Sequence, residues 1–145
     1  MLRYNKDKVK QAIRFLLTND YEISFREVLQ YLYLIDMHYY QHENKSFTND
    51  IMIKTKQGVI LKNTLYHLLC IFKFRIKTVH QNTLNNREKQ IIQNIYNQYR
   101  GLIKTKYIEM CHIDETDKLI DIRDIIRFWD LSAEEIKQVK KDLIS

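Results

Sequence analysis

Hydrophobic residues recur along most of this chain at the three- and four-residue spacing of a helix that buries one side. The first stripe predicts a helix over about residues 5–17, with Asn5 as N-cap because its side-chain oxygen can accept a free backbone N–H. Ser24 and Glu27 are spaced as a capping box and predict a second helix to about residue 42. Later stripes predict helices over about residues 61–69, 84–99, 105–112 and from Ser132 onwards. Gly101 follows the end of the helix at 84–99, and Thr105 is the expected cap of the next one. Residues 122–129 fit either a helix or an extended segment.

Two short stretches depart from the helical period. Residues 72–77 alternate apolar and basic side chains, which predicts a strand with Lys73, Arg75 and Lys77 on its exposed face. Such a row of charge either binds a partner or simply discourages edge-to-edge association. Residues 47–53 predict a turn with a short extended piece. We therefore expect a mainly α fold with a small β element (α+β): one domain over residues 1–145, built as a compact bundle of about six helices with one short strand or hairpin.

Length and composition agree with a single globular domain. A chain of 145 residues that is 45% hydrophobic can bury a core of ordinary size. No apolar run approaches the roughly 18 residues that cross a bilayer, and the first ten residues lack the apolar core of a signal peptide. Cys70 and Cys111 form no recognisable disulfide framework. We expect a soluble, cytoplasmic protein with no membrane partner.

Charge is distributed unevenly along the chain. The net charge is +6, but residues 52–106 hold eleven lysines or arginines and a single acid, Glu88, whereas residues 109–145 hold ten acids and six bases. The two segments can attract each other within the fold, or the basic one can serve an acidic partner, either protein or nucleic acid.

Signals for catalysis are weak. With two glycines the chain has no phosphate-binding loop motif. His38 and His42 lie one helical turn apart, a spacing that suits a metal ion, but the intervening residues lack the glutamate of zinc peptidases. A third ligand would have to come from His67, His80, Cys70, Cys111 or His112. Cys111 and His112 could also suggest a nucleophile and a base, but adjacent residues of a helix point about 100° apart, so we favour a buried cysteine beside a structural histidine. We expect no enzyme activity, no cofactor and no metal.

The helix predicted from Ser24 carries one acid and four tyrosines of special interest. Asp36 falls near the apolar stripe, where a carboxylate needs hydrogen-bond donors. It is either a functional acid or base or, as we favour, a tie between this helix and a neighbouring backbone. Tyrosine is common in protein interfaces, and the four on this helix, Tyr31, Tyr33, Tyr39 and Tyr40, cannot all face inward.

Several short motifs, in a fixed order, resemble the Panacea domain, a family that includes the SocA-like antitoxins of bacterial and phage toxin–antitoxin pairs. They are Tyr31 to Asp36 (YLYLID), Phe47 to Asp50 (FTND), Gly58-Val59, and the region from Leu84 to His112 with its Tyr99-Arg100-Gly101 break. The chain departs from the family in having Gln57-Gly58-Val59 in place of Gly-Pro-Val, and Glu43-Asn44-Lys45 where a glycine often follows the helix. In this resemblance Asp36, Gly58 and His112 are structural motif positions.

The resemblance implies an antitoxin that neutralises a cognate toxin protein by direct, non-catalytic contact. The family acts against toxins of different kinds, and a SocA-like variation would add delivery of the toxin to a protease or chaperone. As contact surface we predict Tyr33, Tyr39, Tyr40, Lys73, Arg75 and Lys77. The alternative function is a nucleic-acid-binding regulator that uses the basic segment 52–106 for phosphate contacts and base stacking.

Overall fold

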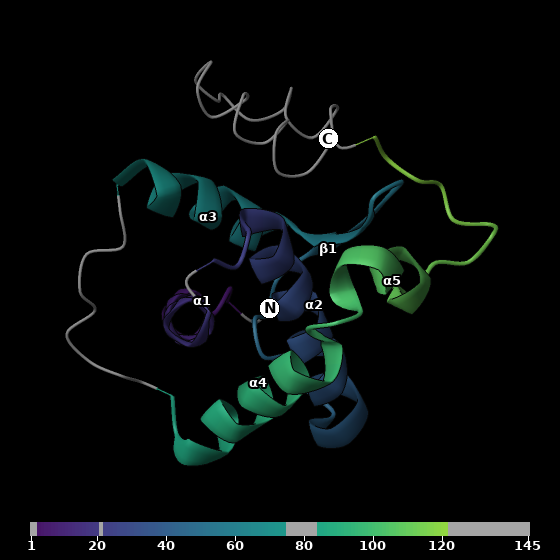
Figure 1. The fold of residues 1–145 in the computed structure, drawn as a ribbon. Helices are drawn as coiled ribbons and strands as arrows, with labels where there is room; N and C mark the ends of the chain where they lie inside the picture. Colours follow the sequence, from purple (N-terminus) through teal and green to yellow (C-terminus); the bar gives the residue numbers. More distant parts are fainter. Residues whose placement is uncertain (1–2, 21, 75–83, 122–145) are drawn as a thin grey trace.

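The computed structural model describes residues 3–20, 22–74 and 84–121, which form five helices and one β-hairpin (Figure 1). This confirms a mainly helical fold with a small β element, although the described part holds five helices and not six. The segments predicted at 122–129 and from Ser132 lie outside the described residues. The elements are α1 (Lys6–Asn19), α2 (Phe25–Glu43), β1 (Met52–Thr55), β2 (Gly58–Leu61), α3 (Lys62–Phe74), α4 (Asn86–Tyr99) and α5 (Ile103–Met110).

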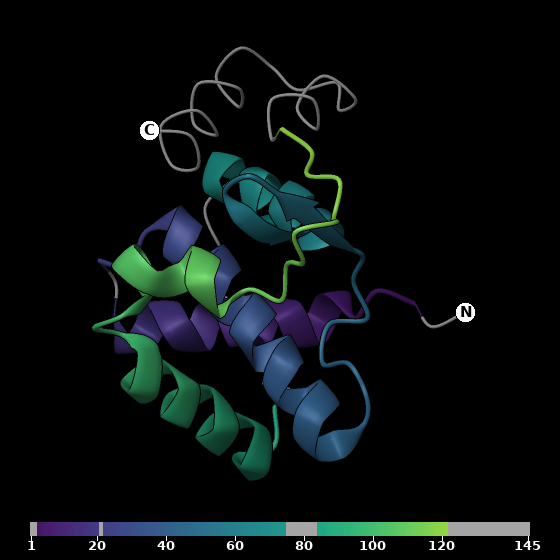
Figure 2. The same ribbon diagram turned by 90° about the vertical axis from the view of Figure 1, so that its right-hand side faces the viewer.

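Helix α2 is the central element. It packs against α1, α3, α4, α5 and strand β2, and it lies in the middle of both ribbon views (Figures 1 and 2). Every residue from Val28 to Asp36 is buried. A helix that is covered on all sides over this length serves as the core around which the other elements are placed.

Most predicted helix boundaries are confirmed to within two residues, but their capping differs in detail. The Ser24 hydroxyl oxygen accepts the Glu27 N–H at 3.1 Å and begins α2 as predicted. Asn5 stands at the N-cap position of α1, yet its amide donates to the Phe47 carbonyl and makes no capping bond. Thr105 lies inside α5, whose N-cap residue is Leu102, so the predicted Thr105 cap is wrong.

The strand predicted at residues 72–77 is wrong where the structure describes it. Helix α3 continues through Phe74, while 75–77 lie outside the described residues. Extending a helix that has already formed adds one backbone hydrogen bond per residue, which outweighs an alternation only a few residues long. The β element is instead the antiparallel hairpin of β1 and β2, paired from Met52–Leu61 to Thr55–Gly58.

Gly58 occupies a position in this hairpin that admits no side chain. Its φ is +104°, and an added Cβ would lie 2.7 Å from Cε2 of Tyr107 and 3.1 Å from Sγ of Cys111. The close approach lets the Tyr107 hydroxyl donate to the Val59 carbonyl at 2.6 Å and the Val59 N–H donate to the Cys111 sulfur at 3.3 Å. Glycine at this position therefore allows α5 to pack directly on β2.

Asp36 is fully buried and holds the turn that follows α2. Its Oδ1 accepts the N–H groups of Phe47 and Thr48, both at 2.8 Å, and the Ser46 hydroxyl at 3.1 Å. Its Oδ2 accepts the Thr48 hydroxyl. Burial raises the pKa of the Asp36 carboxyl, and these four hydrogen bonds oppose that rise. The predicted tie between this helix and a neighbouring backbone is confirmed.

The same turn delivers a second carboxylate to the start of α3. Asp50 accepts the Asn63 N–H at 2.9 Å with Oδ1, and the Thr64 N–H and hydroxyl at 2.7 Å each with Oδ2. A carboxylate at this end of a helix satisfies free N–H groups and complements the helix dipole. Two acids, Asp36 and Asp50, thus fix the positions of α2, the turn and the start of α3 relative to one another.

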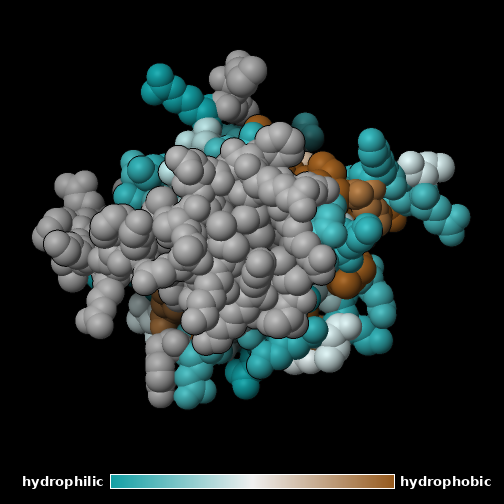
Figure 3. Space-filling view, turned by 90° about the horizontal axis from the view of Figure 1, so that it is seen from above, coloured by the Kyte–Doolittle hydropathy of each residue, from teal (hydrophilic) through white to brown (hydrophobic). Residues whose placement is uncertain are grey.

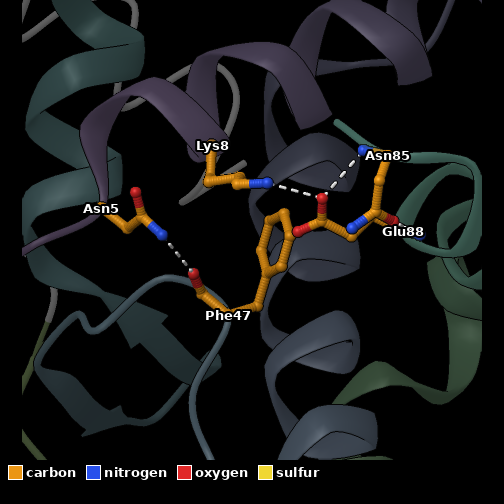
Figure 4. A network of polar contacts seen from close by, with 5 residues as sticks. All are labelled: Asn5, Lys8, Phe47, Asn85 and Glu88. Carbon is orange, nitrogen blue, oxygen red and sulfur yellow. Dashed lines mark hydrogen bonds and ion pairs between the residues drawn. The ribbon is translucent and has the colours of Figure 1, made fainter. Parts of the chain in front are cut away.

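A third acid joins α1 to α4 (Figure 4). The Glu88 carboxylate accepts the Asn85 N–H at 2.9 Å, and Asn85 in turn caps the Glu88 N–H at 2.8 Å, so the two residues form a capping box. The Lys8 ammonium group of α1 donates to the same Glu88 oxygen at 2.5 Å. The one acid of the basic segment therefore serves the fold.

We expect Asp36→Ala to lower the free energy of unfolding by about 3–5 kcal/mol, because it leaves several buried donors without an acceptor. Asp36→Asn keeps one acceptor oxygen and should cost about 2 kcal/mol. Urea unfolding followed by circular dichroism measures both losses. Asp114→Asn, at an exposed carboxylate, is the control and should change little. Equal stabilities for Asp36→Ala and the control would contradict the role given to Asp36.

Candidate functional site

A cavity in the described part of the chain lies between α2 and α4, and Met110 and His112, at the end of α5 and just beyond it, complete its lining. Its volume is about 360 Å³, within the usual range of ligand pockets. One side of α2 and the last turns of α4 form its walls. Its lining residues are Leu34, Met37, His38, Gln41, His42, Ile95, Gln98, Tyr99, Met110 and His112.

The lining of this α2–α4 cleft combines apolar and polar side chains. Leu34 and Ile95 are buried core residues and form the apolar part with two methionines. The polar part consists of imidazole, carboxamide and phenol groups, and Gln41 and Gln98 are exposed. No lysine, arginine, aspartate or glutamate is among the lining residues. The cleft therefore suits an uncharged occupant with both apolar and hydrogen-bonding groups.

Two of its histidines are in direct contact. The rings of His38 and His42 lie with centroids 4.4 Å apart and planes tilted by 38°. Burial and the neighbouring His42 lower the pKa of His38. His38 is therefore neutral at pH 7, when its imidazole both donates and accepts a hydrogen bond.

Of the described side chains considered as a third metal ligand, that of His112 lines the cleft with His38 and His42, whereas those of His67 and Cys111 do not. Even so, no group of three or more His, Cys, Asp or Glu among the described residues is arranged to hold a metal ion. Cys70 has no described side chain, His80 lies outside the described residues, and His67 is buried in α3.

The side chains of Cys111 and His112 lie in different environments. The Cys111 thiol is buried against the hairpin, and burial raises its pKa, which disfavours the reactive thiolate. The His112 side chain is exposed, while its backbone N–H donates to the Tyr33 hydroxyl at 3.2 Å. This geometry supports packing and hydrogen-bonding roles for the pair.

The tyrosines predicted as a contact surface are mostly in the core. Tyr33 and Tyr39 are only 1% and 5% exposed, so the prediction that they lie on the surface is wrong; Tyr40, at 44%, is exposed. Tyr33 packs edge-on against Tyr107, with ring centroids 5.8 Å apart. Because α2 is surrounded by other elements, a tyrosine here is buried on faces that a surface helix would leave open.

The basic residues are partly engaged within the fold. Four of the eleven lysines and arginines of segment 52–106 form ion pairs with acids. Two of these pairs, those of Lys54 and Lys106, join the basic segment to the acidic one, so part of the charge asymmetry is matched within the fold. The side chain of Lys73 is not described, and Arg75 and Lys77 lie outside the described residues. The pairs are Lys54–Asp117, Arg87–Glu43, Lys104–Glu27 and Lys106–Glu109.

Exposed hydrophobic side chains form a second candidate for a functional site, weaker than the α2–α4 cleft. Brown side chains at the right of Figure 3 lie on the side where Figure 1 places α5 and the segment after it. They are few and stand beside hydrophilic residues, as on an ordinary protein surface. The large hydrophobic residues exposed in the described part are Tyr40, Ile51, Tyr66, Leu102, Ile108, Leu119 and Ile120.

Sequence reasoning named the three histidines of the cleft but missed most of its other residues. The signal on α2 was present: Leu34, Met37, His38, Gln41 and His42 follow the spacing of one helix face. What the sequence could not supply was the opposite wall, because the pairing of α2 with α4 is a tertiary contact.

Comparison of the chain with known protein families, with curated proteins and with solved structures found no match in any of the three. The Panacea resemblance therefore stays a prediction. In the described part of the chain, no helix has the length and apolar character needed to span a membrane.

His67 gives a prediction about stability and pH. Burial, with Lys10 and Lys6 nearby, lowers the pKa of His67 to about 4, and its Nε2 has no hydrogen-bond partner. The unfolded chain protonates this imidazole near pH 6.5, so the stability due to neutral His67 is present above that pH and falls on acidification toward pH 4. Between about pH 7.5 and 5, wild type should lose about 2 kcal/mol more than His67→Gln.

Urea unfolding at several pH values measures this difference, and the other titrating groups cancel because both proteins contain them. His112→Gln removes an exposed imidazole and is the control, which should keep the wild-type pH dependence. Parallel curves for wild type and His67→Gln would contradict the prediction.

Proposed function

We propose that this chain is a binding protein of the antitoxin kind, which neutralises a cognate toxin protein by direct contact and without catalysis. The observation that carries the proposal is where the fold places the resembling motifs. The motifs that resemble the Panacea domain lie up to about 80 positions apart, yet they meet in a connected set of contacts.

Three sets of contacts connect the four motifs. Asp36, from the first motif, holds Phe47 and Thr48 of the second. Gly58, from the third, packs on Tyr107 and Cys111 of the last region, and the His112 N–H returns to Tyr33 in the first motif. This mutual dependence supports the resemblance at the level of the fold, and the proposed function follows from the resemblance.

The contact surface proposed from the sequence is now smaller. Tyr40 and the basic residues Lys73, Arg75 and Lys77 remain in it, and Tyr33 and Tyr39 leave it because they are buried. The alternative of nucleic-acid binding through segment 52–106 is weakened by the ion pairs that occupy four of its basic side chains.

Growth rescue tests the proposal. Each open reading frame beside the gene is expressed from an inducible promoter, with and without this chain, and colonies are counted. We expect one neighbour to be toxic and this chain to relieve the toxicity, with an empty vector as control. If no toxic neighbour is rescued, the antitoxin proposal fails, and affinity for single-stranded nucleic acid that falls steeply with salt would favour the regulator.

The basic part of the contact surface is tested separately by charge reversal. Arg75→Glu with Lys77→Glu should weaken toxin binding by roughly tenfold, because rim charges in an interface contribute modestly to affinity. Lys118→Glu, an exposed change in the acidic segment, is the matched control. Equal neutralisation by all of these proteins, with unchanged unfolding midpoints, would remove Arg75 and Lys77 from the contact surface.

A further inference from the structure

We infer that the α2–α4 cleft receives a segment of the partner protein that presents one apolar side chain flanked by uncharged hydrogen-bonding groups. The inference rests on the proposed function, since it names where and how the partner binds. It adds a surface that the contact residues predicted from the sequence do not include.

The apolar residues of the cleft determine which kind of side chain can anchor the partner segment. Leu34 and Ile95 belong to the core, so they hold their places without an occupant. Met37 and Met110 lie beside them, and the flexible thioether chains of methionine adapt to apolar groups of different shape. A cavity of about 360 Å³ over such a floor has room for a large side chain of a partner.

The polar residues of the cleft determine which groups of the partner can lie beside that anchoring side chain. Gln41 and Gln98 come from opposite walls, and each carboxamide offers both a donor and an acceptor. These groups match the backbone N–H and C=O of an extended or turning peptide, which also carry no net charge. Imidazoles from α2 add further donors and acceptors.

The absence of charge in the lining argues against other occupants. An ammonium group entering the cleft would lose water without gaining a carboxylate partner among the lining residues, and a carboxylate would find no lysine or arginine there. The phosphates of nucleic acid bind where lysine or arginine is present, and neither lines this cleft. The lining is thus complementary to an uncharged peptide segment.

The test introduces charge of each sign into the cleft. The double variants Gln41→Glu/Gln98→Glu and Gln41→Lys/Gln98→Lys change exposed positions, so the fold should be retained. Gln90→Glu and Gln90→Lys place the same substitutions on the exposed face of α4 outside the cleft. All four are compared with wild type in growth rescue against the toxic neighbour, and in affinity for that toxin by calorimetry.

We expect both double variants to weaken binding by at least roughly tenfold and to lose rescue, with both Gln90 variants unchanged. Tighter binding with one sign of charge would show a charged occupant and overturn the inference. Wild-type affinity for both double variants would also overturn it, while leaving the proposed function intact. Failure of wild type itself to rescue would end the proposed function and the inference together.

A spectroscopic signature locates the contact independently. Imidazole resonances of His38, His42 and His112 should shift when toxin is added, because these rings line the cleft. The resonance of His67 is an internal control, since this side chain is buried in α3. Shifts absent from the three cleft histidines at saturating toxin would place the partner elsewhere and overturn the inference.

Discussion

The fold depends on one buried carboxylate. Asp36 sits on the central helix with no exposed surface, and a charge in that position is tolerated only because four donors surround it. Those donors belong to a single turn, so satisfying Asp36 also determines the path of the chain after α2. The turn then brings Asp50 to the first free N–H groups of α3. A single electrostatic requirement thus positions the turn after α2 and, through Asp50, the start of α3.

The departures from the Panacea pattern are compatible with this arrangement. Where a glycine often follows the helix, Asn44 adopts a left-handed conformation, with φ of 53° and ψ of 35°. Asparagine is among the few residues other than glycine that visit this region readily, so it ends α2 without proline or glycine. Gly58 lies at a position where backbone conformation and the Tyr107 ring both exclude a Cβ.

The sequence predicted local features well and tertiary ones poorly, for physical reasons. Helix existence and the Ser24 cap follow from side chains within a few positions, and even the role of Asp36 followed from the cost of burying a carboxylate. The alternation at residues 72–77 misled because α3 had already begun upstream. The burial of Tyr33 and Tyr39 depends on how many neighbours surround α2, which no local pattern records.

The same distinction bears on function. The residues that carry the family resemblance are engaged inside the fold: Asp36 in the turn, Gly58 against α5, and the backbone of His112 on Tyr33. Such residues can identify a scaffold, but they have little surface left with which to choose a partner. In the proposed binding mode, the choice of partner falls to exposed side chains that the internal contacts do not use, such as Gln41 and Gln98 on facing walls of the cleft. None of the residues that hydrogen-bond to Asp36 lines the cleft, so a change of Gln41 or Gln98 leaves the contacts of Asp36 untouched.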